Sequence, residues 1–224
     1  MLKVGVFGVG HLGKFHLNNW KQIPTVELVG FFDPNNEAAA EVEKTYGIKR
    51  FMDEAELIAA VDAIDVVTPT HLHFPVCEMA IKMGKHVFVE KPITTTLEEA
   101  LELVKIAEKH NLIGQVGHVE RFNPAIKSVL HMIEEPKFIE CHRLAEFNPR
   151  GNDVSVVLDL MIHDIDIVLK VINSNIKNVI KDINLPVHWG FKLVWKLKPS
   201  EEKPLNKGKL WKWFGAEKIA NALL

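Results

Sequence analysis

This chain has few of the residues that mark secreted, membrane or nucleic-acid-binding proteins. Its 224 residues include two cysteines, Cys77 and Cys141, which are too few for a disulfide framework and fit a reducing compartment. No apolar run reaches the length of about 18 residues that a transmembrane helix needs. The first apolar run begins at Leu2, which leaves no room for a signal peptide. We therefore expect a cytoplasmic protein without a membrane span.

The chain also has no large excess of charge of one sign, although its charged residues are unevenly distributed. The net charge of −2 gives no reason to expect a nucleic acid as partner. Residues 176–224, however, contain ten lysines, four acidic residues and four of the five tryptophans. This shift in composition indicates a boundary near residue 175.

The first half of the chain alternates short apolar runs with helical patterns. Buried strands are expected at 2–7, 26–32, 64–68, 86–89 and 112–117. Helices fit the intervening segments 11–21, 36–46, 53–60, 73–83 and 97–110. This alternation predicts an α/β fold with a doubly wound parallel Rossmann sheet. After Gly117 we expect a strand or exit loop over 118–123, a helix at 124–134, a strand at 137–147 and a long helix at 154–172, which begin a second, incomplete α+β domain.

A glycine motif follows the first strand directly. Gly8 permits the tight turn, Gly10 lets the backbone approach a pyrophosphate, and Gly13 lets the next helix pack against the strand. The amides at the start of that helix supply an anion site. Asp33 ends the second strand twenty residues after Gly13, where it can accept hydrogen bonds from a ribose diol. These residues predict a dinucleotide site rather than a structural turn.

The acidic residue also favours one cofactor. A carboxylate at Asp33 repels a 2′-phosphate, and residues 34–36 offer no arginine to receive one, so NAD is favoured over NADP. We expect cofactor contacts from the glycine turn and from the carboxyl ends of the strands at 64–68 and 86–89. The residues are Gly8, Gly10, His11, Leu12, Gly13, Asp33, Thr68, Pro69, His73 and Glu90.

Lys91 follows the strand at 86–89, inside the motif Glu90-Lys91-Pro92. Ligands of open α/β sheets bind beyond the carboxyl ends of the strands, so Lys91 is placed toward the expected crevice. There it can donate a hydrogen bond to a substrate hydroxyl. The alternative is an ordinary surface turn. His71 and His73 lack a third ligand nearby in the sequence, so no metal is expected.

The helix at 154–172 is apolar except for a narrow polar seam. At about 100° per residue, Asp159, His163, Asp166 and Lys170 fall within an arc of about 60°. Asp159 and His163 are four residues apart, so the carboxylate can orient the imidazole and raise its basicity. This arrangement suits a general base near neutral pH. A seam that simply faces solvent is the alternative.

Together, Gly8-x-Gly10-x-x-Gly13, Glu90-Lys91-Pro92 and Asp159-x-x-x-His163 resemble the Gfo/Idh/MocA oxidoreductases over about residues 1 to 175. The resemblance implies that Lys91, Asp159 and His163 form the catalytic set, with Lys91 and His163 also contacting substrate. It further implies NAD-dependent oxidation of a ring hydroxyl of a sugar or nucleotide sugar.

Two further segments, 117–124 and 160–166, look most like the branch of nucleotide-sugar 3-dehydrogenases that act on UDP-N-acetylglucosamine. This resemblance places Arg121 and Asn123 near a sugar or phosphate. The family implies homo-oligomers for its full-length members.

The resemblance stops before the end of the chain. Family members continue into a large open-faced sheet, but residues 176–224 do not show its alternating strands, which argues against the family oligomer here. We divide the chain into an NAD-binding domain at 1–118, the start of a substrate domain at 119–175, and an atypical basic, tryptophan-rich tail at 176–224. A truncation or frameshift is favoured over an authentic short variant. A non-catalytic NAD-binding protein, serving as a sensor or partner subunit, is therefore the alternative function.

Overall fold

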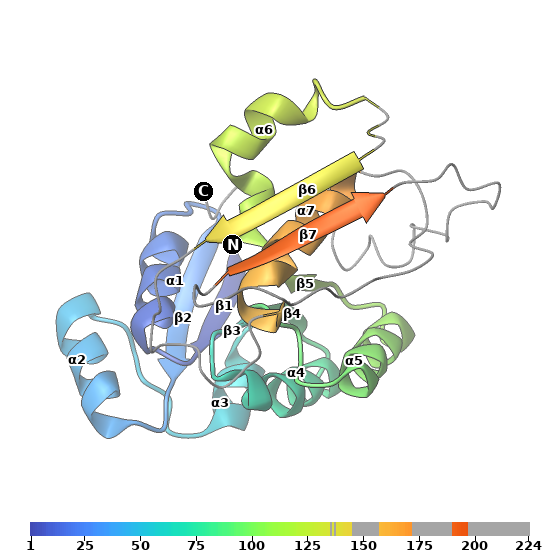
Figure 1. The fold of residues 1–224 in the computed structure, drawn as a ribbon. Helices are drawn as coiled ribbons and strands as arrows, with labels where there is room; N and C mark the ends of the chain where they lie inside the picture. Colours follow the sequence, from blue (N-terminus) through green and yellow to red (C-terminus); the bar gives the residue numbers. More distant parts are fainter. Residues whose placement is uncertain (135, 137, 145–156, 172–189, 197–224) are drawn as a thin grey trace. The chain divides into compact units, whose positions relative to one another are not determined.

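The structure is a computed structural model that describes residues 1–134, 136, 138–144, 157–171 and 190–196. The described residues divide into two compact units, the first ending at Gly117 and the second beginning at His118. Each unit is described by itself below, and both are drawn in Figure 1.

The first unit is a five-stranded parallel sheet with helical connections (Figure 1). Its strands lie in the order β2-β1-β3-β4-β5, so the order reverses between β1 and β3. In sheets of this order, ligands bind at that reversal, outside the carboxyl ends of the strands. The elements are β1 (Leu2–Phe7), α1 (His11–Lys21), β2 (Val26–Phe32), α2 (Asn36–Tyr46), α3 (Glu54–Ala60), β3 (Ala63–Val66), η1 (Thr70–Leu72), α4 (His73–Lys82), β4 (His86–Val89), α5 (Leu97–Lys109) and β5 (Gly114–Val116).

These elements confirm the parallel Rossmann-type sheet expected from the sequence. Local signals in the sequence set the ends of several of its helices. The Asn35 side chain accepts from two amides at the start of α2, and Gly47 ends that helix with a left-handed φ of 64°. Thr96 and Glu99 form a reciprocal capping box at the start of α5. Asp53 caps α3 by accepting from the amide of Glu56. Such caps satisfy amides that the first helical turn leaves without a partner.

Two hydrophobic clusters hold the first unit together. One is built around α1 and α2 and includes Leu17, Trp20 and Phe31. The other is built around α3, α4 and α5 and includes Leu57, Ile81 and Leu103. The continuous burial of β1, β3 and β4 agrees with a parallel sheet that is covered by helices.

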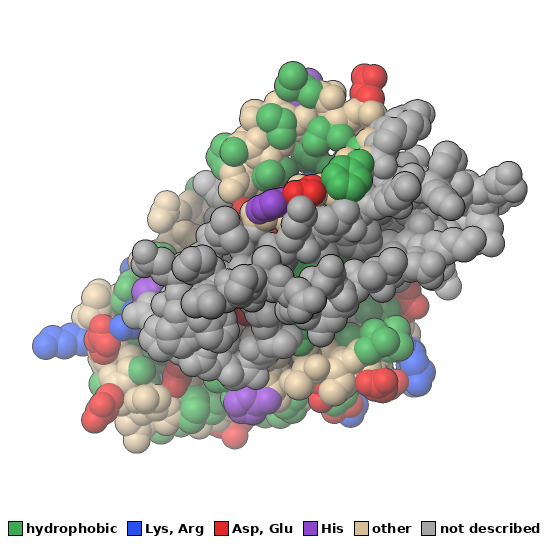
Figure 2. Space-filling model, viewed as in Figure 1, with side chains coloured by type: hydrophobic (Ala, Val, Ile, Leu, Met, Phe, Trp, Pro, Cys, Tyr) green, Lys and Arg blue, Asp and Glu red, His purple; other side chains and the backbone are tan. Residues whose placement is uncertain are grey.

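The second unit contains η2 (Val119–Phe122), α6 (Pro124–Leu130), β6 (Phe138–Leu144), η3 (Val157–Met161), α7 (Ile162–Val171) and β7 (Gly190–Lys196). β6 pairs antiparallel with β7, from Phe138 opposite Lys196 to Leu144 opposite Gly190. Figure 2 shows hydrophobic side chains gathered over α6. Val129 on α6 is exposed, as are Met132 and Ile133 just after it. No helix among the described residues is long and apolar enough to cross a membrane.

The second unit departs from the sequence expectations in three places. Residues 119–122 form a 3₁₀ helix, where a strand or an exit loop was expected. The long helix expected at 154–172 is a π turn over Val157–Met161 followed by α7, while 154–156 and 172 lie outside the described residues. The tail contains the strand β7, which the sequence analysis did not predict. This strand is recognised by its pairing with β6. Residues 197–224 of the tail also lie outside the described residues.

Candidate functional site

The glycine turn after β1 is shaped by close approach of the backbone. Gly8 has φ of +89°, and a Cβ there would lie 2.8 Å from the carbonyl oxygen of Val67, just after β3. A Cβ on Gly13 would overlap the carbonyl oxygen of Gly8. Both positions therefore require glycine, which places the start of α1 against the reversal in strand order.

Asp33 holds this turn as well as ending β2. Its Oδ2 accepts from the Val9 amide at 2.8 Å, and its Oδ1 accepts from the Asn35 amide at 2.8 Å. The carboxylate thus ties the glycine turn to the loop after β2, and the residue is 9% exposed. Its role toward a ribose stays a prediction.

The space in front of the turn fits a dinucleotide. A Cβ added to Gly10 would meet no atom within 4 Å, so the backbone there faces open space. Thr68 Oγ1, at the end of the neighbouring β3, is buried without a hydrogen-bond partner in the described part of the chain. An open approach to the helix N-terminus and an unsatisfied hydroxyl are what a pyrophosphate and a nicotinamide carboxamide require.

Arg50 lies beside this end of the site, which the local sequence did not reveal. Its Nη2 donates to the carbonyl oxygen of Asp33 at 2.8 Å and to Asn36 Oδ1 at 2.9 Å. The absence of arginine from 34–36 therefore does not keep a guanidinium away from Asp33. The contact depends on a bridge between Phe31 and Arg50, a pairing that no local pattern signals.

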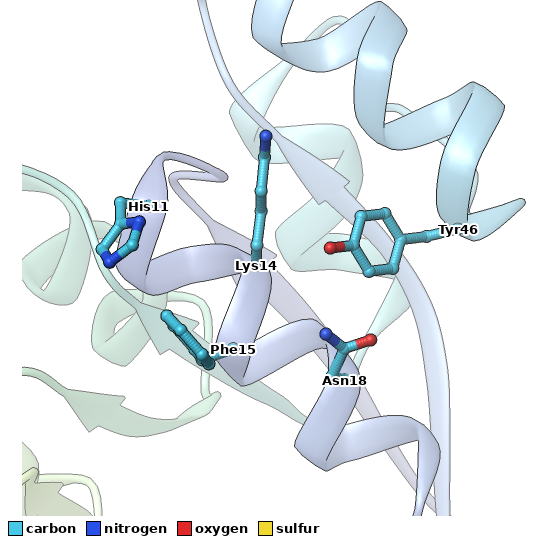
Figure 3. Close-up of a pocket in the computed structure, with 5 residues that line it drawn as sticks. All are labelled: His11, Lys14, Phe15, Asn18 and Tyr46. Carbon is cyan, nitrogen blue, oxygen red and sulfur yellow. The ribbon is translucent and has the colours of Figure 1, made fainter.

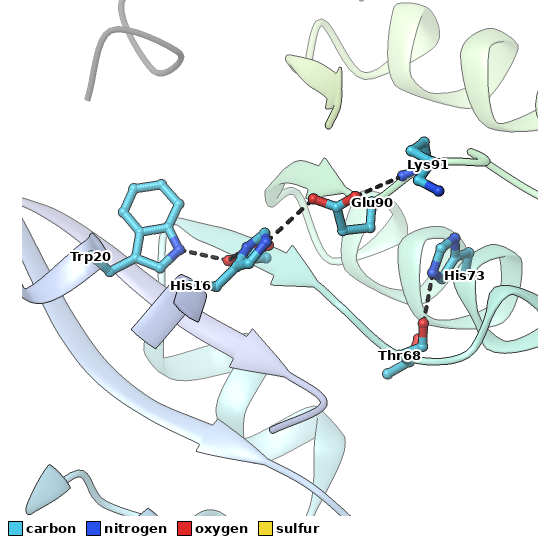
Figure 4. Close-up of polar contacts among 7 residues, drawn as sticks. His16, Trp20, Thr68, His73, Glu90 and Lys91 are labelled. Atoms are coloured by element: carbon cyan, nitrogen blue, oxygen red, sulfur yellow. Dashed lines mark hydrogen bonds and ion pairs between the residues drawn. The ribbon is translucent and has the colours of Figure 1, made fainter. Parts of the chain in front are cut away.

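His73 joins the loops that follow β3 and β4. Its Nδ1 lies 2.8 Å from the carbonyl oxygen of Pro92. Its Nε2 lies 2.9 Å from the carbonyl oxygen of Thr68, as Figure 4 shows. The side chain is 1% exposed, and the Lys91–Pro92 peptide bond is cis. His73 therefore fixes the relative position of Thr68 and the Lys91-Pro92 turn. Its predicted contact with the cofactor stays untested.

Behind the Lys91 turn lies a buried polar cluster that the sequence did not reveal. His16 Nδ1 lies 2.8 Å from Asp65 Oδ2, and His16 Nε2 lies 3.2 Å from Glu90 Oε1. Trp20 Nε1 donates to the same Asp65 oxygen at 2.6 Å. Burial alone lowers the pKa of His16, but Asp65 and then Glu90 outweigh it and raise the pKa from 6.5 to about 10.

His11 and Leu12 of the glycine motif face outward. His11 and the 46% exposed Leu12 begin α1. His11, Lys14, Phe15 and Asn18 line a hollow of about 180 Å³ with Tyr46 at the end of α2 (Figure 3). Lys14 is paired with Glu41 at 2.6 Å. The hollow has no buried charged group that would recognise a ligand.

In the second unit, Asp159 and His163 lie on one continuous helical segment. Asp159 is in the π turn η3 and His163 is in the first turn of α7, and both side chains are partly buried. A π turn is wider than an α turn, so the arc expected at 100° per residue applies only from residue 162 onward. π turns occur frequently at functional sites.

Asp166 of the seam and the predicted substrate contacts Arg121 and Asn123 make contacts within this unit. Asp166 is 6% exposed and forms a two-pronged ion pair with Arg121, with His118 Nδ1 4.0 Å away. This corrects the alternative of a solvent-facing seam at Asp166. Asn123 caps α6 by accepting from Ala125 and donates to Glu120. Substrate contacts by Arg121 and Asn123 stay predictions.

The structure thus brings together the residues expected at the cofactor end of the first unit. Gly8, Gly13 and Asp33 meet at one turn, and Thr68, His73 and Glu90-Lys91-Pro92 are joined at the carboxyl edge. Lys91 belongs to the first unit, whereas Asp159 and His163 belong to the second. Their convergence into one catalytic set remains a prediction.

Comparisons with known proteins agree with this geometry. Residues 2–118 match the Gfo/Idh/MocA family, described as an oxidoreductase family with an NAD-binding Rossmann fold. UDP-N-acetylglucosamine 3-dehydrogenase of Acidithiobacillus ferrooxidans is 43% identical over 169 residues, which are 75% of this chain and 53% of that protein. Scyllo-inositol 2-dehydrogenase (NAD(+)) of Bacillus subtilis is 28% identical over 80% of this chain and 56% of its own length.

Solved structures give the same result. A structure of the Acidithiobacillus ferrooxidans enzyme aligns with a TM-score of 0.71 and 39% identity, covering 77% of this chain and 57% of that one. Scyllo-inositol dehydrogenase of Lactobacillus casei, with NAD(H) and scyllo-inositol bound, aligns with a TM-score of 0.68 and 26% identity over 76% of this chain and 56% of that one. The chain therefore spans about half the length of the relatives that it matches.

Proposed function

Because this chain belongs to the Gfo/Idh/MocA oxidoreductase family, we propose that it oxidises a ring hydroxyl of a sugar or nucleotide sugar. The observation that supports the proposal most directly is the carboxyl edge of the first unit. There an open glycine turn follows β1 and Lys91 follows β4, two parallel strands of the same sheet with β3 between them. An edge of this kind is where open α/β sheets bind their ligands.

The cofactor in this proposal is NAD, held by the turn at Gly8, Gly10 and Gly13 and by Asp33. When bound, it would accept a hydride from the substrate carbon. NAD rather than NADP is favoured by the Asp33 carboxylate. Because Arg50 lies beside Asp33, the affinities of the chain for NAD and for NADP have to be measured and compared.

In the proposed mechanism, Lys91 donates a hydrogen bond to the oxygen of the reacting hydroxyl. His163, oriented by Asp159, removes the proton from that hydroxyl. The chain's contribution is thus to orient the substrate and to move one proton. Arg121 and Asn123 are proposed to contact the sugar or its phosphate, and UDP-N-acetylglucosamine is the first substrate to test because of the relative that acts on it.

The alternative is an NAD-binding protein without turnover. The chain matches about half the length of the related dehydrogenases, so turnover has to be measured on this chain itself. A substrate panel that contains UDP-N-acetylglucosamine and scyllo-inositol, followed by NADH absorbance, separates the two. Turnover supports the enzyme, whereas thermal stabilisation by NAD without turnover supports the binder.

The role of Lys91 can be tested in the same assay. We expect Lys91→Ala to lose at least about 100-fold in turnover while NAD binding persists, which is typical of the loss of an acid–base group. Lys109→Ala, an exposed lysine at the end of α5, is the matched control and should turn over as the parent does. Near-normal turnover by Lys91→Ala would remove Lys91 from the mechanism.

A further inference from the structure

The cluster behind the Lys91 turn contains three ionisable side chains from three elements of the first unit. His16 comes from α1, Asp65 from β3, and Glu90 from the residue after β4. Their exposed fractions are 7%, 0% and 7%. Charged groups are rarely buried to this extent unless each has a partner, because removing them from water is costly. This cluster therefore needs an explanation beyond packing.

The geometry of the cluster favours a protonated His16. Both ring nitrogens of His16 face carboxylate oxygens, at 2.8 Å from Asp65 and 3.2 Å from Glu90. Ionised carboxylates only accept, so with both carboxylates ionised the two ring nitrogens donate and the ring is an imidazolium. The pKa of His16, raised to about 10, agrees with this state at neutral pH. Phe88 on β4 packs against the His16 ring, and the indole of Trp20 donates to Asp65.

Glu90 carries the effect of His16 to the next residue. Glu90 Oε1 faces His16, while Glu90 Oε2 accepts from the backbone amide of Lys91 at 3.1 Å (Figure 4). A Cβ on Gly117, at the end of β5, would lie 2.6 Å from Glu90 Oε1, so the glycine leaves room for the carboxylate. The carboxylate of Glu90 therefore contacts His16 of α1 through Oε1 and accepts from the Lys91 amide through Oε2.

We propose that His16 is a positioning residue for Lys91, acting as a buried imidazolium that holds Glu90 where it caps the Lys91 amide. In this way α1, which begins at the glycine turn, also sets the backbone that carries Lys91. The proposal rests on the proposed role of Lys91 in the reaction. A merely structural role for His16 would stabilise the first unit without affecting Lys91 in particular.

The protonation of His16 can be measured in the unaltered full chain. Nitrogen NMR of protein labelled at histidine, with His16 assigned through His16→Gln, reports whether one or both ring nitrogens carry hydrogen. The proposal expects both to carry hydrogen at about pH 8.5, two units above the ordinary histidine pKa. A neutral ring at that pH could not donate to both carboxylates and would overturn the proposal, whether or not any variant folds.

Two variants separate positioning from packing. His16→Gln leaves one amide nitrogen to donate and places an oxygen where the second donor was, so it cannot bridge both carboxylates. Trp20→Phe is the matched control, because Trp20 is equally buried and donates to the same Asp65 oxygen, yet leaves the His16–Glu90 contact intact. The readout is hydrogen exchange at the Lys91 amide, followed in lysine-labelled protein and assigned with Lys91→Arg.

We expect exchange at the Lys91 amide to be at least about tenfold faster in His16→Gln, since a hydrogen bond to a charged group is weakened. Trp20→Phe should leave that rate within about twofold of the parent. Equal rates in all three proteins would overturn the proposal. If His16→Gln does not fold, Glu90→Gln weakens the same contact from the other side and should accelerate the same amide.

Activity provides a second, separable result. With NAD and UDP-N-acetylglucosamine, His16→Gln should lower kcat at least about tenfold while the Kd for NAD changes less than about twofold. Full turnover by Lys91→Ala would refute the proposed function but leave the amide result standing. Loss of turnover in Lys91→Ala, combined with an unaffected Lys91 amide in His16→Gln, would refute the positioning role alone.

Discussion

Raising the pH should lower the stability of the first unit, because His16 loses its proton. The size of the effect depends on how far the surroundings of His16 shift its pKa. The pKa of His16 is about 10 in the folded chain and near 6.5 when unfolded. Between these values only the folded chain holds the proton. The stabilisation is therefore complete below about pH 6.5 and is lost as the pH rises through about 10. Within this window the free energy of unfolding falls by about 1.4 kcal/mol per pH unit.

Urea unfolding of the full chain, followed by far-UV circular dichroism, measures this loss. From about pH 7.5 to about pH 9.5 the His16 contribution falls by about 3 kcal/mol, which is a large part of a typical domain's stability. Other groups titrate over the same range, so His16→Gln is compared under the same conditions and their contributions cancel. The unaltered chain should lose more stability with pH than the variant does. Parallel pH dependences in the two proteins would refute the reasoning, because they would mean that His16 is neutral when folded.

Three further results follow from the geometry of the first unit. Gly13→Ala should weaken NAD binding at least about tenfold by calorimetry, because its Cβ overlaps a carbonyl oxygen of Gly8 that cannot move freely; unchanged affinity would contradict the close approach. Asp33→Ala should lower both the melting temperature and the affinity for NAD, since two amides lose their acceptor, and its affinity for NADP should fall less. Burial raises the pKa of the Cys77 thiol, so a thiol reagent should reach Cys77 only in urea, with Cys77→Ala as the reference; rapid reaction of the folded chain at that position would disprove its burial.

Short-range signals in the sequence determined most of the first unit. The bounds of α1 and α2 could be read from residues within a few positions, because a glycine turn, an asparagine cap and a C-terminal glycine act locally. The apolar runs of β1 and β4 were equally clear, since strands of a covered parallel sheet are buried on both faces. Each family motif and the dinucleotide turn could also be recognised from residues that lie close together in the sequence.

Contacts between distant segments were decided only by the tertiary structure. His16 and Asp65 are 49 positions apart, Arg50 reaches Asp33 across 17, and Arg121 meets Asp166 across 45. No periodicity in one segment reveals which side chain of another will face it, because that depends on how the strands and helices pack. β7 was missed for the same reason, since a strand is defined by its partner. The sequence alone therefore determined which elements form and which motifs they carry, whereas packing decided which charged side chains meet, because burial forces each of them to find a partner.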